Sequence, residues 1–166
     1  MIVDKKYKIE KAVSTDGTRY VLNHVYLDVE KKRAVATTGR ILAVVPCDIA
    51  DDDVTGMIPV DAIKAARKVK GLNIVVGANG NCETLNGQTF KRPDGTFPKY
   101  EGVIPKRASG GIKISLNAKF LYQLAQATGD DEVILDIQDA GSAVIVTPYH
   151  REPNAFGVIM PIRIKK

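Results

Sequence analysis

The sequence predicts an α+β fold in which short strands, most of them antiparallel, pack on two helices. Apolar and polar residues alternate through most of the chain, a pattern that is typical of strands with one buried face. In two other segments the apolar residues recur about every 3.6 residues, as they do in amphipathic helices. Dipeptides such as Asp16-Gly17 and Asn86-Gly87 separate the alternating segments and are typical of tight turns.

Ten segments carry the strand pattern. They cover residues 7–14, 19–29, 34–37, 41–46, 73–77, 89–92, 112–115, 133–137, 143–147 and 156–164. We expect residues 1–46 to supply additional N-terminal strands and no helix. The last segment contains Pro161, which cannot donate a ladder hydrogen bond and therefore predicts a sheet edge or a break in pairing.

The first predicted helix begins after Pro59 and ends at Gly71, a residue type that commonly stops helices. Its apolar stripe consists of Ala62, Ile63, Ala66 and Val69. The opposite side carries the cations Lys64, Arg67 and Lys68.

The second predicted helix begins after Asn117, a favourable N-cap, and ends at Gly129. We expect its inward residues to be Phe120, Leu121, Leu124 and Ala125. Its outward residues are then Lys119, Gln123 and Gln126.

Each predicted helix follows a short strand and precedes three strand-like segments, so residues 57–92 and 111–164 are interpreted as two β-α-β-β-β units. The similarity lies in their organisation and not in matched residues. A connector at 94–106 separates the units. Its apolar residues Phe97, Tyr100 and Val103 are unsuited to a free linker, so we expect it to pack across a surface.

Composition and charge narrow the function classes. The chain has 166 residues, and 45% of them are hydrophobic, which is enough to form an apolar core. Its net charge of +5 is compatible with a polyanionic partner. Cys47 and Cys82 lack the spacing of a zinc site or a disulfide framework. Without a signal segment or an apolar run long enough to cross a bilayer, the sequence predicts a cytoplasmic protein with no membrane role.

Catalytic signatures are absent from the sequence. It contains no G-x-x-x-x-G-K-S/T, G-x-G-x-x-G, H-E-x-x-H or G-x-S-x-G motif. The run Asp51-Asp52-Asp53 could be imagined as a magnesium site, but a solvated acidic turn is the better interpretation. His24 and His150 lack a neighbouring nucleophile and are interpreted as structural or surface histidines. We therefore expect no enzyme activity, no cofactor and no metal.

Seven segments resemble, in order, motifs of the bacterial replicative sliding clamp, the β processivity subunit of the replicative DNA polymerase. They are RYVLNHVYLDV (19–29), AVATTGRILAVVP (34–46), MIPVDAIKAARKV (57–69), TFPKYEGVIPK (96–106), ISLNAKFLYQLAQATG (114–129), EVILDIQDAGSAVIV (132–146) and GVIMPIRI (157–164). The resemblance implies a DNA-clamp-like fold. Residues 1–95 resemble the middle clamp domain, 96–110 form the connector and 111–166 resemble the last domain, amounting together to one compact clamp domain.

The sequence also departs from the family's pattern. A family member carries three clamp domains with two helices each, whereas this chain has two candidate helices in all. Thr38 stands where the family commonly has aspartate. The helix that the family has before residue 19 is replaced here by a strand-like segment.

The resemblance implies two sets of binding residues. In the family, short peptides of polymerases and other clients bind a hydrophobic cleft, and carried over by motif its lining is Leu22, Asn23, Thr37, Gly39, Arg40, Leu42, Pro98, Val103, Val158, Ile159, Met160, Pro161 and Arg163. Helices of the family face the backbone of duplex DNA without reading its sequence. The matching residues are Lys64, Arg67, Lys68, Lys119, Gln123 and Gln126.

Two hypotheses therefore stand. The first is a minimal clamp homologue that binds duplex DNA non-specifically and client peptides, and that assembles as a homo-oligomer of roughly six copies to close a ring. The second is a non-encircling peptide-binding module, of phage or mobile-element type, that modulates or competes with a host clamp. An enzyme with an unrecognised site is a weaker third.

Overall fold

The chain divides into two compact units. The structure, a computed structural model, describes residues 1, 3–4, 6–68, 74–77, 79–105, 111–150 and 155–164. The first unit spans Met1–Ile104 and the second spans Pro105–Lys166. Each unit has an apolar core of its own.

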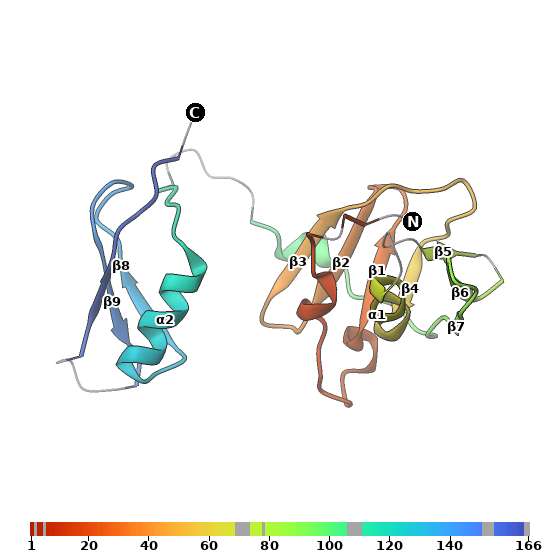
Figure 1. Ribbon diagram of the computed structural model, residues 1–166, viewed down its shortest axis with the longest axis horizontal. Coiled ribbons are helices and arrows are strands. Elements are labelled where there is room, and N and C mark those ends of the chain that lie inside the picture. Colours follow the sequence, from red (N-terminus) through yellow and green to blue (C-terminus); the bar gives the residue numbers. More distant parts are fainter. Residues whose placement is uncertain are drawn as a thin grey trace. The chain divides into compact units, whose positions relative to one another are not determined.

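In its described residues, unit 1 contains two antiparallel sheets and one α-helix (Figure 1). The four-stranded sheet has the order β3-β2-β1-β4, with β1 (His24–Asp28), β2 (Arg33–Thr37), β3 (Leu42–Pro46) and β4 (Gly56–Pro59). The three-stranded sheet has the order β5-β6-β7, with β5 (Ile74–Val76), β6 (Asn81–Thr84) and β7 (Thr89–Lys91). Helix α1 (Val60–Lys68) follows β4 directly, so the predicted β-α-β-β-β order holds here.

Strand alternation builds the main core of unit 1. Val25 and Leu27 of β1 are fully buried, and Val25 lies opposite Ile58 of β4. Helix α1 buries Ala62, Ile63 and Ala66 in the same core, as its stripe predicted; Val69 lies outside the described residues. The other face of the sheet belongs to a second cluster.

That second cluster forms where the connector packs on the four-stranded sheet. Val35 and Met57 are buried against Phe97 and Tyr100. The expectation that the apolar connector packs across a surface is therefore confirmed for its first part. Because one sheet is covered on both faces, β2 has three fully buried residues in a row.

The acidic turn at 51–53 requires a correction. Asp51 and Asp52 are exposed, but Asp53 is buried and forms an ion pair with the amino group of Met1 at 2.5 Å. Asp53 also accepts hydrogen bonds from the amides of Ala50 and Val76. The sequence did not reveal this role because Met1 and Val76, two of the partners of Asp53, are distant from it along the chain.

Of the two predicted N-terminal strands, the one at 7–14 is wrong and the one at 19–29 is wrong in part. Residues 7–14 contain a 3₁₀ helix, η1 (Ile9–Ala12), and residues 19–29 begin with a second one, η2 (Tyr20–Asn23), before β1. Ile9 and Ala12 are both buried. Residues three positions apart fall on opposite faces of a strand but on one side of a 3₁₀ turn, so burial of both favours the helix.

Unit 2 is a three-stranded antiparallel sheet with a helix on one face. The sheet order is β10-β9-β8, with β8 (Val133–Asp136), β9 (Val144–Pro148) and β10 (Gly157–Ile159). Helix α2 (Ala118–Thr128) has the predicted termini: Asn117 accepts from the Lys119 amide, and Gly129 is left-handed with φ 78°. Leu121 and Leu124 pack on the core of Val144, Val146 and Ile159.

Three expectations for unit 2 are corrected. Residues 112–115 form no strand, although the Ser115 carbonyl accepts a hydrogen bond from the Ile162 amide. The last strand ends at Ile159, just before Met160 and Pro161, where proline interrupts pairing. Phe120 is 55% exposed instead of inward, because a three-stranded sheet covers only a narrow stripe of the helix.

Candidate functional site

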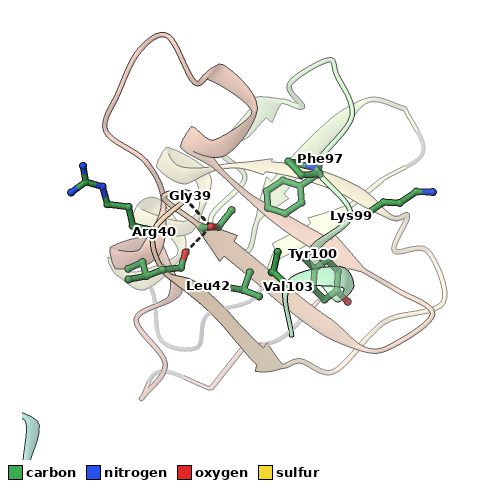
Figure 2. A pocket seen from close by; sticks show the side chains of 10 residues that line it. Gly39, Arg40, Leu42, Phe97, Lys99, Tyr100 and Val103 are labelled. Carbon is green, nitrogen blue, oxygen red and sulfur yellow. Dashed lines mark hydrogen bonds between the residues drawn. The ribbon is translucent and has the colours of Figure 1, made fainter. Parts of the chain in front are cut away.

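A pocket of about 430 Å³ lies on unit 1 between the turn that joins β2 to β3 and the connector (Figure 2). It is lined by Thr37, Gly39, Arg40, Ile41, Leu42, Phe97, Pro98, Lys99, Tyr100 and Val103. Most of these side chains are apolar or aromatic. The pocket is therefore suited to an apolar group of a ligand.

The first wall is a turn that is held by its own hydrogen bonds. The Thr37 hydroxyl donates to the Ile41 carbonyl at 2.6 Å and accepts from the Gly39 amide at 3.0 Å. Gly39 has φ 88°, a conformation that favours glycine. The Arg19 guanidinium donates to the Thr38 carbonyl at 3.0 Å. These contacts fix the backbone beside Arg40.

The second wall is the connector, which is anchored by two aromatic side chains. The Phe97 ring stacks on Tyr26 of β1, with ring centroids 4.9 Å apart and planes 10° apart. Tyr100 begins a short 3₁₀ helix, η3 (Tyr100–Val103), and is buried. Its hydroxyl donates to Asp28 at 2.7 Å. Val103, three residues beyond this second anchor, is 70% exposed and lies at the rim of the pocket.

Electrostatics strengthen the anchor at Tyr100. Burial and the hydrogen bond to Asp28 raise the pKa of Tyr100 to about 12. Burial opposes ionisation of Asp28, but hydrogen bonds from Tyr100 and from the Lys31 amide lower its pKa. Lys31 also pairs with Glu101 of η3. The phenol therefore stays neutral and the carboxylate charged over the ordinary pH range.

The pocket brings together six of the residues that the resemblance implied for peptide binding. They are Thr37, Gly39, Arg40, Leu42, Pro98 and Val103. Leu22 packs in the cluster behind them. Asn23 does not line the pocket, and its side-chain oxygen is buried without a hydrogen-bond partner among the described residues.

Four lining residues were not in the predicted set: Ile41, Phe97, Lys99 and Tyr100. Phe97 and Tyr100 were identified only as apolar residues of the connector. Their proximity to Pro98 and Val103 in the same short motif is the signal that could have found them. Ile41 and Lys99 are next to predicted residues in the sequence.

The other implied residues belong to unit 2. Val158 and Met160 are exposed, at 51% and 64%, and Arg163 is exposed as well. Pro161 is half-buried. Ile159 requires a correction, because it is buried in the core of unit 2 and its side chain is not available to a ligand. Alternation along β10 puts Val158 and Ile159 on opposite faces.

The residues implied for DNA contact differ in their surroundings. Lys64, Lys68, Lys119 and Gln123 are exposed, and Gln126 donates to Asp131. Arg67 requires a correction. It forms an ion pair with Glu10 at 2.7 Å, donates to the Tyr7 carbonyl and is only 20% exposed. Its guanidinium therefore joins α1 to η1 and does not project to solvent.

Neither a metal site nor a reactive cysteine occurs in the described part of the chain. It contains no cluster of His, Cys, Asp and Glu that could hold a metal ion. Cys47 and Cys82 are buried and unpaired, and burial raises the pKa of each thiol to about 11. Neither described α-helix could span a membrane.

Solved structures of similar fold include a DNA polymerase sliding clamp from Bacillus subtilis, 22% identical with a TM-score of 0.66 over 93% of this chain and 45% of that chain. A DNA polymerase III beta chain from Streptococcus pneumoniae is 18% identical, with a TM-score of 0.65 over 94% and 46%. A sliding clamp from Pseudomonas aeruginosa is 19% identical, with a TM-score of 0.54 over 93% and 62%. This chain has the bacterial sliding-clamp fold.

The clamp-like α+β fold that the sequence predicted is therefore confirmed. The chain spans 45–62% of the length of the clamp structures that it matches. No protein-family model and no curated protein matches the sequence.

Proposed function

We propose that this protein is a non-enzymatic accessory factor of DNA replication or repair, and that its pocket on unit 1 binds short apolar peptides of a DNA polymerase or another client. One observation carries this proposal: the pocket is apolar and pre-formed, and it occurs in a chain with the sliding-clamp fold. Preformed grooves bind short peptides well because little ordering entropy is lost. The solved structures of similar fold from Bacillus subtilis and Pseudomonas aeruginosa are DNA polymerase sliding clamps.

The tail of unit 2 carries exposed apolar side chains of its own. Phe156, Val158, Met160 and Ile162 alternate with less exposed residues and are all more than half exposed. An exposed methionine among aliphatic side chains suits a surface that adapts to varied short motifs. We propose that Val158 and Met160 contribute to peptide binding.

The proposed DNA contact rests on exposed lysines. Lys64 and Lys68 on α1 and Lys119 on α2 supply cations that suit a phosphate backbone. Contact of this kind ignores sequence and weakens steeply with salt. Two exposed lysines on α1 form a weaker stripe than the three cations expected from the sequence, because Arg67 pairs with Glu10.

That weakened stripe favours the second candidate, a peptide-binding module that does not encircle DNA. Such a module would compete with or modulate a full clamp by keeping the peptide pocket alone. The mass of the protein in solution, with and without duplex DNA, separates the two. A closed homo-oligomer on DNA supports the clamp, and a monomer that ignores DNA supports the module.

Peptide binding is tested by fluorescence anisotropy with a labelled clamp-binding peptide of a DNA polymerase. We expect Val103→Ser and Leu42→Ala each to weaken binding several-fold, since both line the pocket. Met160→Ala tests the unit 2 tail in the same assay. Leu85→Ser is the matched control, because Leu85 is 60% exposed and does not line the pocket. Equal affinity of all four variants would refute the peptide site.

A further inference from the structure

We infer that the ligand of the unit 1 pocket is an acidic peptide, in which carboxylates flank a short apolar anchor on both sides. This inference rests on the proposed peptide-binding function and adds the chemistry of the partner. The pocket itself is lined by two cations, Arg40 and Lys99, and by no acidic residue. A groove with an apolar floor and cationic ends fits such a peptide.

The two cations stand on opposite walls. Arg40 belongs to the turn between β2 and β3, and Lys99 belongs to the connector. In Figure 2 both side chains extend outward at opposite ends of the pocket, with Leu42 and Val103 between them. A peptide that places an apolar side chain near Leu42 therefore runs towards a cation in each direction.

Both cations are available to a ligand. Arg40 and Lys99 are exposed, and neither forms an ion pair with any residue that the structure describes. Arg40 is not held by its own turn, since only its backbone amide contacts Thr38. An incoming carboxylate would not have to displace an existing partner.

The acidic residues of the same region are paired or buried. Asp16 pairs with Arg19 beside the turn, and Lys31 pairs with both Glu101 and Asp28. Asp28 is buried and accepts a hydrogen bond from Tyr100. Since Lys31 balances only one of its two carboxylates, Arg40 and Lys99 leave this region with a net positive charge. Among the described residues they are the unpaired charges at the rim, and they attract acidic peptides and repel cationic ones.

The test compares two synthetic peptides of equal length that share one Leu-Phe anchor. One carries two aspartates on each side of the anchor, and the other carries serines in their place. We expect the acidic peptide to bind about tenfold more tightly at 50 mM salt, because each exposed charge contact is worth only a few-fold. Raising the salt to 500 mM should remove most of that difference.

Charge reversal identifies the residues responsible. We expect Arg40→Glu combined with Lys99→Glu to weaken binding of the acidic peptide at least tenfold, a larger loss than the same variant causes for the serine peptide. Lys11→Glu combined with Lys91→Glu is the matched control, since both lysines are exposed, the change in net charge is the same and neither residue lines the pocket. Circular dichroism checks that each variant is folded.

The outcomes separate this inference from the proposed function. Binding of both peptides with equal affinity and no salt dependence would overturn the acidic preference and keep the peptide site. Binding of neither peptide would overturn both. Equal losses in the control (Lys11→Glu with Lys91→Glu) and in the pocket variant (Arg40→Glu with Lys99→Glu) would show a non-specific effect of net charge. Tighter binding of a DNA oligonucleotide at the same pocket would assign the cations to nucleic acid. Either result contradicts the inference.

Discussion

The hydroxyl of Tyr100 donates a 2.7 Å hydrogen bond to Oδ2 of Asp28, and both residues are buried. Asp28 ends β1, whereas Tyr100 begins η3, so the bond ties the connector to the sheet. The connector is one wall of the pocket. Together with the stacking of Phe97 on Tyr26, this contact sets the position of that wall.

We predict that Tyr100→Phe lowers the free energy of unfolding of unit 1 by about 1–3 kcal/mol, because the Asp28 carboxylate loses a buried donor. Peptide affinity should fall as well, since the wall is less firmly held. Urea unfolding and anisotropy measure the two effects. Tyr122→Phe is the control, because Tyr122 is exposed in unit 2. Equal stabilities of the two variants would contradict the prediction.

The parts of the fold that were predicted well depend on local sequence. Helix α2 could be predicted because its N-cap at Asn117 and its left-handed end at Gly129 are encoded within a few residues. The segment at 7–14 could not, because its 3₁₀ turn is selected by burial of Ile9 and Ala12 in a core that distant strands build. Tertiary packing overrides a short local pattern.

The site shows the same division. The turn at 37–42 and the residues Pro98 and Val103 were found through short motifs. The hydrogen bond of Tyr100 with Asp28, which spans 72 positions, was not. Away from the pocket, the ion pair of Met1 with Asp53 also joins residues that are remote in sequence. The same holds for Arg67, whose charge predicted solvent contact although Glu10 lies beside it. Sequence patterns report the type of a side chain, and only the fold supplies its partner.

Asp53→Asn should destabilise unit 1 by about 3–5 kcal/mol. The substitution leaves the buried Met1 ammonium, 2.5 Å from the carboxylate, without a counter-charge. Urea unfolding followed by the amide NMR signals of β5 is the appropriate measurement, because the Val76 amide also donates to Asp53. The control is Asp52→Asn at the exposed neighbouring position. A loss no larger than that of the control would disprove the importance of the pair.

The stability of unit 1 should fall as the pH is lowered from 7.5 to 5. Burial lowers the pKa of His24 below its ordinary value of 6.5, against an opposing effect of Asp61. The unfolded chain then binds a proton more readily than the folded one, so this contribution is complete above pH 6.5 and is lost below it. Urea unfolding at several pH values measures the slope.

His24→Phe keeps a ring against Tyr20, 5.0 Å away between centroids, and cannot be protonated. We expect it to flatten the pH dependence of unit 1, whereas His150→Phe in unit 2 should leave that dependence unchanged. An unaltered slope in His24→Phe would show that another group titrates.

Gly157→Ala should destabilise unit 2 by about 1–3 kcal/mol through overpacking. A Cβ atom at Gly157 would lie 2.6 Å from Cδ2 of Leu124, where α2 rests on β10. If this clash is the cause, the cost of Gly157→Ala should shrink when Leu124→Ala is already present, although Leu124→Ala is itself destabilising. Urea unfolding of the four members of this double-mutant cycle measures the coupling. Gly141→Ala is the control, since its added Cβ would meet only Asp139 at an ordinary 3.5 Å. Additive costs in the cycle would mean that the glycine is needed for its backbone and not for the close approach of the helix.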